Sequence, residues 1–238
     1  MATVMQPAPV ALARDRFFYS GMALVCALIV LVGFAPTFYL RAEGLGPLPT
    51  LLVVHGLFFT AWIALLITQT SLIAVNRRDI HRRLGVVGAC VATVLVALGL
   101  TAAVTSLRLG HTPLPGLDPR SFFAIPVQAM VNFSILIGAA IAQRRNVEAH
   151  KRLILLGTFN ILGAALARWP VIGAYGPPMF FGLIDLLMLA CVAYDWRTRG
   201  SVHRVYKIAV PLVILSEPFV LGLSMSGPWL AFASMIKG

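Results

Sequence analysis

Four ionisable side chains lie inside stretches of the chain that are otherwise apolar: His55, Arg168, Asp185 and Glu217. A charge near the centre of a lipid bilayer costs about 2.5–3.5 kcal/mol on insertion scales, so such side chains usually face a partner or a wet cavity. Carboxyl and imidazole groups can bind and release protons, and a guanidinium can pair with a carboxylate. The chemistry that this set offers is therefore ion pairing, proton exchange or recognition of a small polar ligand.

The composition indicates that membrane-spanning helices position these residues. The 238 residues are 59% hydrophobic and 11% charged, whereas soluble domains carry about 25% charged residues. Apolar runs of around 20 residues can cross the hydrocarbon core, and we count about seven of them. We predict an all-α fold, a polytopic membrane helical bundle that forms a single domain over residues 1–238, with a short cytoplasmic segment at 1–16. The predicted spans are residues 17–40, 50–75, 84–107, 121–142, 151–170, 178–195 and 206–224.

Basic residues are distributed unevenly between the two sides of this predicted bundle. Fourteen lie before the first span or in the second, fourth and sixth loops, and four lie on the other side. The positive-inside rule then places the N-terminus in the cytoplasm and the C-terminus outside. The net charge of +11 is assigned to topology and to contact with anionic lipid headgroups, and not to nucleic acid. The stretch from Pro228 to Ile236 is too short to span and is expected at the interface or packed back on the bundle.

Counting about 1.5 Å per residue from the helix ends puts the four embedded groups in the outer half of the bundle. Polar side chains on two adjacent turns of the fourth span lie at a similar depth. We therefore predict an outward-facing ligand or proton site, in which Arg168 pairs with a carboxylate and His55 converges with Asp185 on one pocket. The alternative is that the buried charges only hold helices together. The candidate site residues are His55, Asp185, Glu217, Arg168, Asn132 and Gln128.

A weak internal repeat occurs where the chain re-enters the membrane from the cytoplasmic side. Three loops end in a histidine beside basic residues, namely His81, His150 and His203, with an acidic or hydroxyl residue expected at each helix start. One interpretation is that these elements only set the topology. The other is that the histidines converge on a metal ion or a headgroup phosphate, although their separations of 69 and 53 positions match no metal-binding motif. The metal is therefore unknown, and these three histidines are the candidates for its ligands.

Three stretches, residues 55–62, 79–85 and 148–153, resemble a widespread group of uncharacterised bacterial multi-pass inner-membrane proteins. The resemblance covers nearly the whole length and implies the fold, the topology and the bacterial inner membrane, but no activity. Residues 81–85, His-Arg-Arg-Leu-Gly, are also loosely similar to cytochrome-b-like and cytochrome-oxidase-assembly membrane proteins. That similarity implies haem, whereas the paired intramembrane histidines of a haem bundle are missing from this chain.

The sequence contains no nucleotide-binding loop, zinc-protease motif or nucleophile elbow. It therefore assigns no enzymatic activity, and we expect none. The leading prediction is an inner-membrane protein that binds or transports a small polar or ionic ligand, with proton coupling as an option. One alternative is a haem- or metal-handling membrane redox protein, and another is a structural or assembly subunit. No cofactor is assigned beyond the haem of the first alternative. The expected partners are the lipid bilayer and a small molecule or ion, with homo-oligomers left open.

Overall fold

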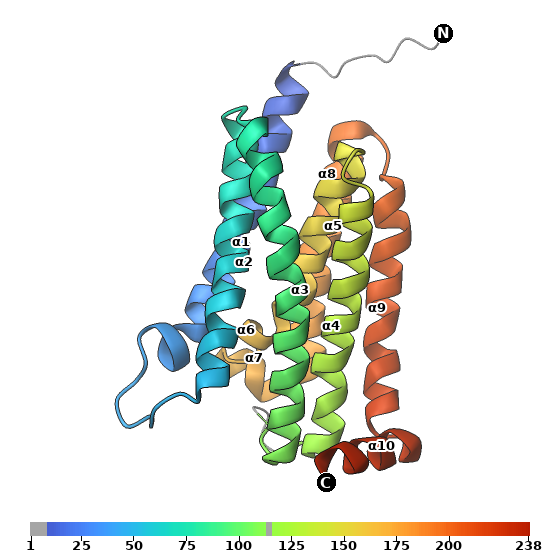
Figure 1. The fold of residues 1–238 in the computed structure, drawn as a ribbon. Coiled ribbons are helices and arrows are strands. Elements are labelled where there is room, and N and C mark those ends of the chain that lie inside the picture. Colours follow the sequence, from blue (N-terminus) through green and yellow to red (C-terminus); the bar gives the residue numbers. More distant parts are fainter. Residues whose placement is uncertain (1–8, 113–115) are drawn as a thin grey trace.

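The computed structural model describes residues 9–112 and 116–238, and every regular element in this part of the chain is helical. In Figure 1 the long helices stand side by side along one direction, and α10 lies across the end opposite to the start of α1. The elements are α1 (Pro9–Phe34), the π-helical turn η1 (Ala35–Tyr39), α2 (Thr50–Ala74), α3 (Arg78–Arg108), α4 (Pro119–Ala142), α5 (Val147–Asn160), α6 (Gly163–Leu166), α7 (Pro170–Tyr175), α8 (Pro177–Arg199), α9 (Arg204–Ser224) and α10 (Gly227–Lys237).

Side chains in the loops decide where several helices begin. The Asn146 side chain accepts a hydrogen bond from the Ala149 N–H at 3.2 Å and caps α5. At α9 the cap is His203, whose Nδ1 accepts from the Val205 N–H at 3.2 Å, and not Ser201 as the sequence suggested. A cap satisfies a backbone donor that the first turn of a helix otherwise leaves unpaired. The acidic residues expected at helix starts do lie in the first turns of α3 and α5.

Six helical segments of the described chain are long and apolar enough to cross a membrane, and they match six of the predicted spans. The predicted fifth span, residues 151–170, differs because it is not one helix. The helix α5 ends at Asn160, and the chain continues through a turn into the short helices α6 and α7. The six segments are Arg14–Tyr39, Thr50–Ala74, Arg78–Arg108, Pro119–Ala142, Pro177–Arg199 and Arg204–Ser224.

The interrupted segment still runs from one end of the bundle to the other. At the start of α5, Glu148 lies within 3.4 Å of Arg199 at the end of α8. At the far end, Tyr175 and Pro177 share a surface cavity with Leu117, which precedes α4. Residues 147–176 therefore cross the bundle in pieces, and α7 lies toward the end of the bundle where α10 lies (Figure 1).

The final helix, α10, packs back on the bundle, which confirms the second of the two placements expected for residues 228–236. The Trp229 indole N–H donates to the Arg120 carbonyl at 2.9 Å. Ala233 is fully buried in a small apolar cluster with Leu107 and Phe123. The helix thereby covers the ends of α3 and α4 instead of extending α9.

The helix α1 approaches the interrupted segment so closely that only glycine fits at the contact. A Cβ atom added to Gly33 would overlap the backbone of Ala165 in α6. In membranes, small residues at helix contacts allow backbones to approach and gain packing energy. Gly33 therefore positions α6, and with it the interruption, against α1.

Replacing Gly33 by alanine should destabilise the fold by about 1–3 kcal/mol, because a backbone neighbour has no rotamer with which to move away. The matched control is Gly21→Ala on the same helix, where a Cβ atom would meet nothing within 4 Å. Thermal unfolding of both variants in detergent checks this expectation. Equal melting temperatures for the two variants would contradict the close contact between α1 and α6.

Candidate functional site

A layer of uncharged polar side chains crosses the interior of the bundle where α5 ends. The Gln128 Nε2 and Asn132 Nδ2 groups on α4 donate to the Ser216 Oγ on α9, at 2.8 Å and 3.0 Å. Asn132 also donates to the Asn160 Oδ1 at 3.2 Å, and Asn160 donates to the Ala129 carbonyl at 2.7 Å. Three helices are thus joined by amide and hydroxyl groups that carry no charge.

This layer has unused acceptor oxygens. The hydrogen bonds found among the described residues use the amide N–H groups of Gln128 and Asn132 as donors, while their amide oxygens accept none. An amide oxygen carries two lone pairs and binds donors or hard cations. The layer can therefore accept a ligand that donates hydrogen bonds or carries positive charge.

A pair of carboxyls lies at a similar level between α8 and α9. The carboxyls of Asp185 and Glu217 lie next to each other, and Glu217 is buried, with 7% of its surface exposed. Two adjacent carboxyls can share one proton, because a carboxyl donates a hydrogen bond only when it is protonated. The Asp185 Oδ1 is buried and has no partner among the described residues, which leaves one more acceptor open.

The end of α5 places a break in the backbone beside these groups. Through the break the N–H groups of Ile161 and Leu162 bond back three residues, to Thr158 and Phe159. Irregular backbone at membrane depth is tolerated where protein or a wet cavity surrounds it. Here α4, α8 and α9 pack against α5, and the Trp62 indole N–H on α2 donates to the Thr158 hydroxyl at 3.1 Å.

The predicted convergence of His55 with Asp185 is not found. The helix α2 packs mainly against α1 and α3, whereas α8 packs mainly against α5, α6, α7 and α9. Neither residue lines the cavity at the start of α9 or the cavity beside Leu117 and Tyr175. His55 stacks on Phe59 with ring centroids 4.3 Å apart, and its Nδ1 has no partner among the described residues. The matched depth of His55 and Asp185 does not predict their contact, because depth does not determine which helices are neighbours.

The predicted ion pair of Arg168 with Asp185 or Glu217 is also not formed. No carboxylate of the described residues lies within salt-bridge distance of Arg168, which donates to the Ala164 carbonyl at 2.6 Å. Its guanidinium lies over the Phe34 ring, 4.3 Å from the centroid. The two carboxyls lie next to each other instead, so the embedded groups separate into a carboxyl pair, an amide layer and the two residues His55 and Arg168.

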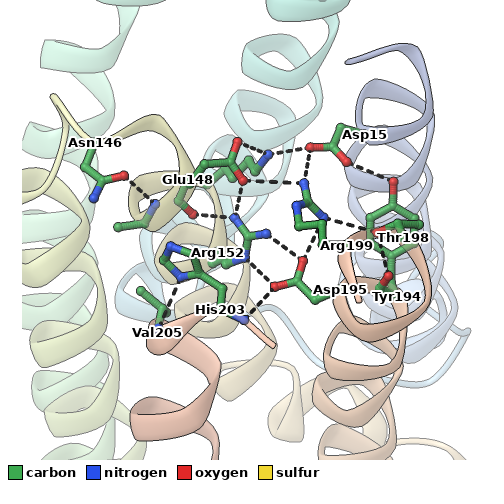
Figure 2. A network of polar contacts seen from close by, with 12 residues as sticks. Asp15, Asn146, Glu148, Arg152, Tyr194, Asp195, Thr198, Arg199, His203 and Val205 are labelled. Atoms are coloured by element: carbon green, nitrogen blue, oxygen red, sulfur yellow. Dashed lines mark hydrogen bonds and ion pairs between the residues drawn. The ribbon is translucent and has the colours of Figure 1, made fainter. Parts of the chain in front are cut away.

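A second polar cluster, at the end of the bundle where α1 begins, was not predicted as a site. Arg152 on α5 and Asp195 on α8 form a fully buried bidentate ion pair, with distances of 3.0 Å and 2.5 Å (Figure 2). Asp195 also accepts from Arg199 at 2.8 Å and from the His203 N–H at 3.1 Å. Arg152 donates to the Glu148 carboxylate at 2.6 Å. These bonds join α5, α8 and the start of α9.

The same network reaches α1 through Asp15. Its carboxylate binds Lys151 at 2.6 Å, Arg199, and the Tyr194 hydroxyl at 2.9 Å (Figure 2). Partial burial opposes the ionisation of Glu148, but hydrogen bonds and charge from Lys151 and Arg152 dominate and lower its pKa to about 2. Glu148 is therefore ionised at neutral pH and paired with both bases.

The spacing of acidic and basic residues in the sequence indicates part of this network. Arg152 and Arg199 each follow an acidic residue, Glu148 and Asp195, by four positions, which is the spacing of helical ion pairs. The predicted topology counts the two arginines only among its fourteen basic residues on one side. Only the packing of α5 on α8 shows that two such pairs merge.

The three candidate metal-binding histidines do not come together, because two of them lie near each other and the third caps a helix. His81 and His150 have ring centroids 6.5 Å apart, and the His150 Nδ1 lies 2.8 Å from the Ala140 carbonyl. The ring of His203 caps α9 instead. No group of three or more histidine, cysteine or acidic side chains suited to a metal ion occurs among the described residues.

Comparison of the chain with protein-family models, with curated proteins and with solved structures found no match. The function must therefore be argued from the two polar clusters. The Arg152 network is saturated with internal partners, which is typical of a structural element. The amide layer and the carboxyl pair retain open acceptors, so they form the candidate functional site.

The substitution Asp195→Asn should destabilise the protein by about 3–5 kcal/mol, because it leaves the buried Arg152 without its counter-charge. Asp79→Asn is the control, since Asp79 and Arg77 form a surface pair with 61% and 56% of their side chains exposed, and little change is expected there. Melting temperatures in detergent compare the two variants. Similar losses in both would show that the Arg152 network does not hold the helices together.

Proposed function

We propose that this protein spans the bacterial inner membrane with its N-terminus in the cytoplasm, and binds or transports a small polar or ionic ligand in its polar layer. The carboxyl pair of Asp185 and Glu217 couples this ligand to a proton. The support comes from the described contacts, from the excess of basic residues around the start of α1, and from six helices long and apolar enough to span a membrane.

The single observation that carries the proposal is the coincidence of open acceptors with a broken helix. Asn160, the last residue of α5, bonds to Asn132 in the layer. Interrupted membrane helices with polar side chains are the usual construction of ligand sites near the bilayer midplane, and the C-terminal end of a half-helix favours positive charge. A small cation or a hydrogen-bond donor is therefore the ligand class that this layer suits best.

The carboxyl pair suits proton coupling because its proton can be exchanged for another positive group. Two carboxylates in contact repel each other when both are ionised, so one of them is held protonated. A cation arriving at the neighbouring oxygens would favour release of that proton. Ligand entry and proton exit would then be linked by electrostatics alone.

Carbodiimide labelling tests whether the pair is protonated, because this reagent modifies protonated carboxyls in apolar surroundings. Labelling at neutral pH, located by mass spectrometry, is expected on Glu217 or Asp185 and should disappear in the double variant Asp185→Asn, Glu217→Gln. The exposed Glu43 serves as the control carboxyl.

Proton movement in vesicles tests the coupling itself. Proteoliposomes with an entrapped pH dye would be challenged with sodium chloride or potassium chloride, using wild type, Glu217→Gln and Asn132→Leu. We expect a salt-dependent proton flux in wild type that both variants reduce at least about tenfold, which corresponds to roughly 1.4 kcal/mol. The proposal fails if neither carboxyl is labelled and the three proteins give equal fluxes.

A second candidate function, metal or haem binding, is favoured by the pair His81 and His150. If the Ala140 carbonyl accepts from the Nδ1 of His150, then Nε2 is free to ligate, as in most metal-bound histidines. The His81 Nδ1 and the Gln69 Oε1 are buried without partners among the described residues, and the Gln69 amide donates to the His81 carbonyl at 3.3 Å. Orphaned polar atoms of this kind are the expected surroundings of a missing ligand.

Spectroscopy and elemental analysis of the purified protein distinguish this candidate from the leading one. Bound haem would give a Soret band, and a bound transition metal would appear at near-stoichiometric amounts. Either signal should be lost in His81→Ala and retained in His111→Ala. Retention of the signal in both variants would place the group elsewhere, and no signal after supplying haem or metal would exclude the pair as its site.

A further inference from the structure

A cavity opens at the same end of the bundle as the Arg152 network, between the end of α4, the start of α5 and the start of α9. Its volume is about 400 Å³. Its lining is polar at the helix ends and apolar along the helices. The lining residues are Gln143, Asn146, Ala149, Leu153, His203, Arg204, Val205, Ile208 and Ala209.

The polar end of the cavity is a set of donors. His203 accepts the Val205 N–H through Nδ1, so a neutral ring carries its proton on Nε2. Burial, followed by the nearby Arg152 charge, lowers the pKa of His203 and favours that neutral form. Arg204 adds a permanent positive charge, and the N-terminal end of α9 adds its dipole. In Figure 2, Asn146, His203 and Val205 lie together on one side of the ion-pair network.

The apolar end of the cavity reaches Ile208, on the exposed side of α9. Leu153 and Ala209 form its wall. Ile208 and Leu212, four residues apart on one face of the helix, are 48% and 63% exposed. In a membrane-spanning helix this face meets lipid tails. The cavity is thus amphipathic along the direction of the helices, as a lipid molecule is.

The charge around the opening selects an anionic molecule. Arg144 and Arg145 follow the end of α4, and Lys207 lies one turn into α9, while no acidic side chain lines the cavity. Glu148, the nearest acidic residue in sequence, is already bound to Lys151 and Arg152. Each basic residue near the membrane surface contributes about 1 kcal/mol to anionic lipid binding.

We propose that this cavity is a binding site for an anionic phospholipid. Its phosphate contacts His203 and Arg204 at the start of α9, and one acyl chain lies against Leu153 and Ile208 in the cavity and continues over Leu212 on the exposed face of α9. The site is separate from the amide layer and does not depend on the proposed transport. Its effect would be to attach the loops between α4 and α5 and between α8 and α9 to one lipid.

The test measures the melting temperature of the purified full-length chain in a neutral detergent as phosphatidylglycerol is titrated in. Phosphatidylcholine with the same acyl chains and inorganic phosphate are added in parallel. A ligand of the native state raises the melting temperature in a saturable manner. We expect saturation with phosphatidylglycerol only, and co-purified anionic lipid in native mass spectra.

Two variants locate the effect. Arg204→Gln removes a charge that lines the cavity, while Arg197→Gln removes an exposed charge from the adjacent end of α8. We expect the first to weaken the apparent affinity roughly fivefold and the second to leave it unchanged. His203→Asn, which keeps a capping oxygen for α9 but shortens the donor, should weaken it as well.

Three outcomes would overturn the proposal. Equal shifts with the two phospholipids would show that no headgroup is recognised. An equal shift with inorganic phosphate would indicate a free-anion site without an acyl groove. Equal weakening by Arg204→Gln and Arg197→Gln would indicate diffuse attraction between the basic loops and lipid.

Discussion

The burial of Arg152 and Asp195 is the constraint on which the rest of the bundle depends. An ion pair removed from water is tolerated only when every donor and acceptor is matched, because its desolvation penalty is several kcal/mol per ion. Asp195 therefore requires Arg152 from α5, Arg199 from its own helix and a backbone N–H at the start of α9. These bonds specify the register of three helices at one end of the molecule, and Asp15 adds α1.

The Arg152 network holds the helices together at one end of the bundle, and the chain after α5 is interrupted near the middle. The helix α5 stops after 14 residues, too few to cross a membrane, and the short helices α6 and α7 complete the crossing. A broken helix leaves backbone groups that lipid cannot satisfy. The surrounding helices enclose these groups. Gly33 allows α1 to pack closely against α6, and Asn160 links the end of α5 to α4. The polar layer thus lies beside the irregular end of α5, where other helices surround the backbone.

The two polar clusters differ in how completely their groups are used. In the Arg152 network, charge is matched by charge, so a ligand would have to displace an existing partner. In the layer formed by α4, α5 and α9, amide oxygens remain available. A similar contrast separates the cavity at the start of α9, which His203 and Arg204 line, from the saturated Arg152 network. Hydrogen-bond donors and acceptors without internal partners indicate where this protein can bind a ligand. The number of polar residues alone does not.

The sequence by itself determined the helical membrane class, because its long apolar runs carry too few charges for a soluble domain. It also selected Gln128, Asn132, Asp185 and Glu217 as embedded polar residues. Only the tertiary structure decided their partners, since helical periodicity reports depth and face but not which helix lies opposite. For that reason Arg168 received the wrong partner, and the predicted fifth span hid a break that depends on packing. The Arg152 network was missed because spacing within one helix says nothing about the helix beside it.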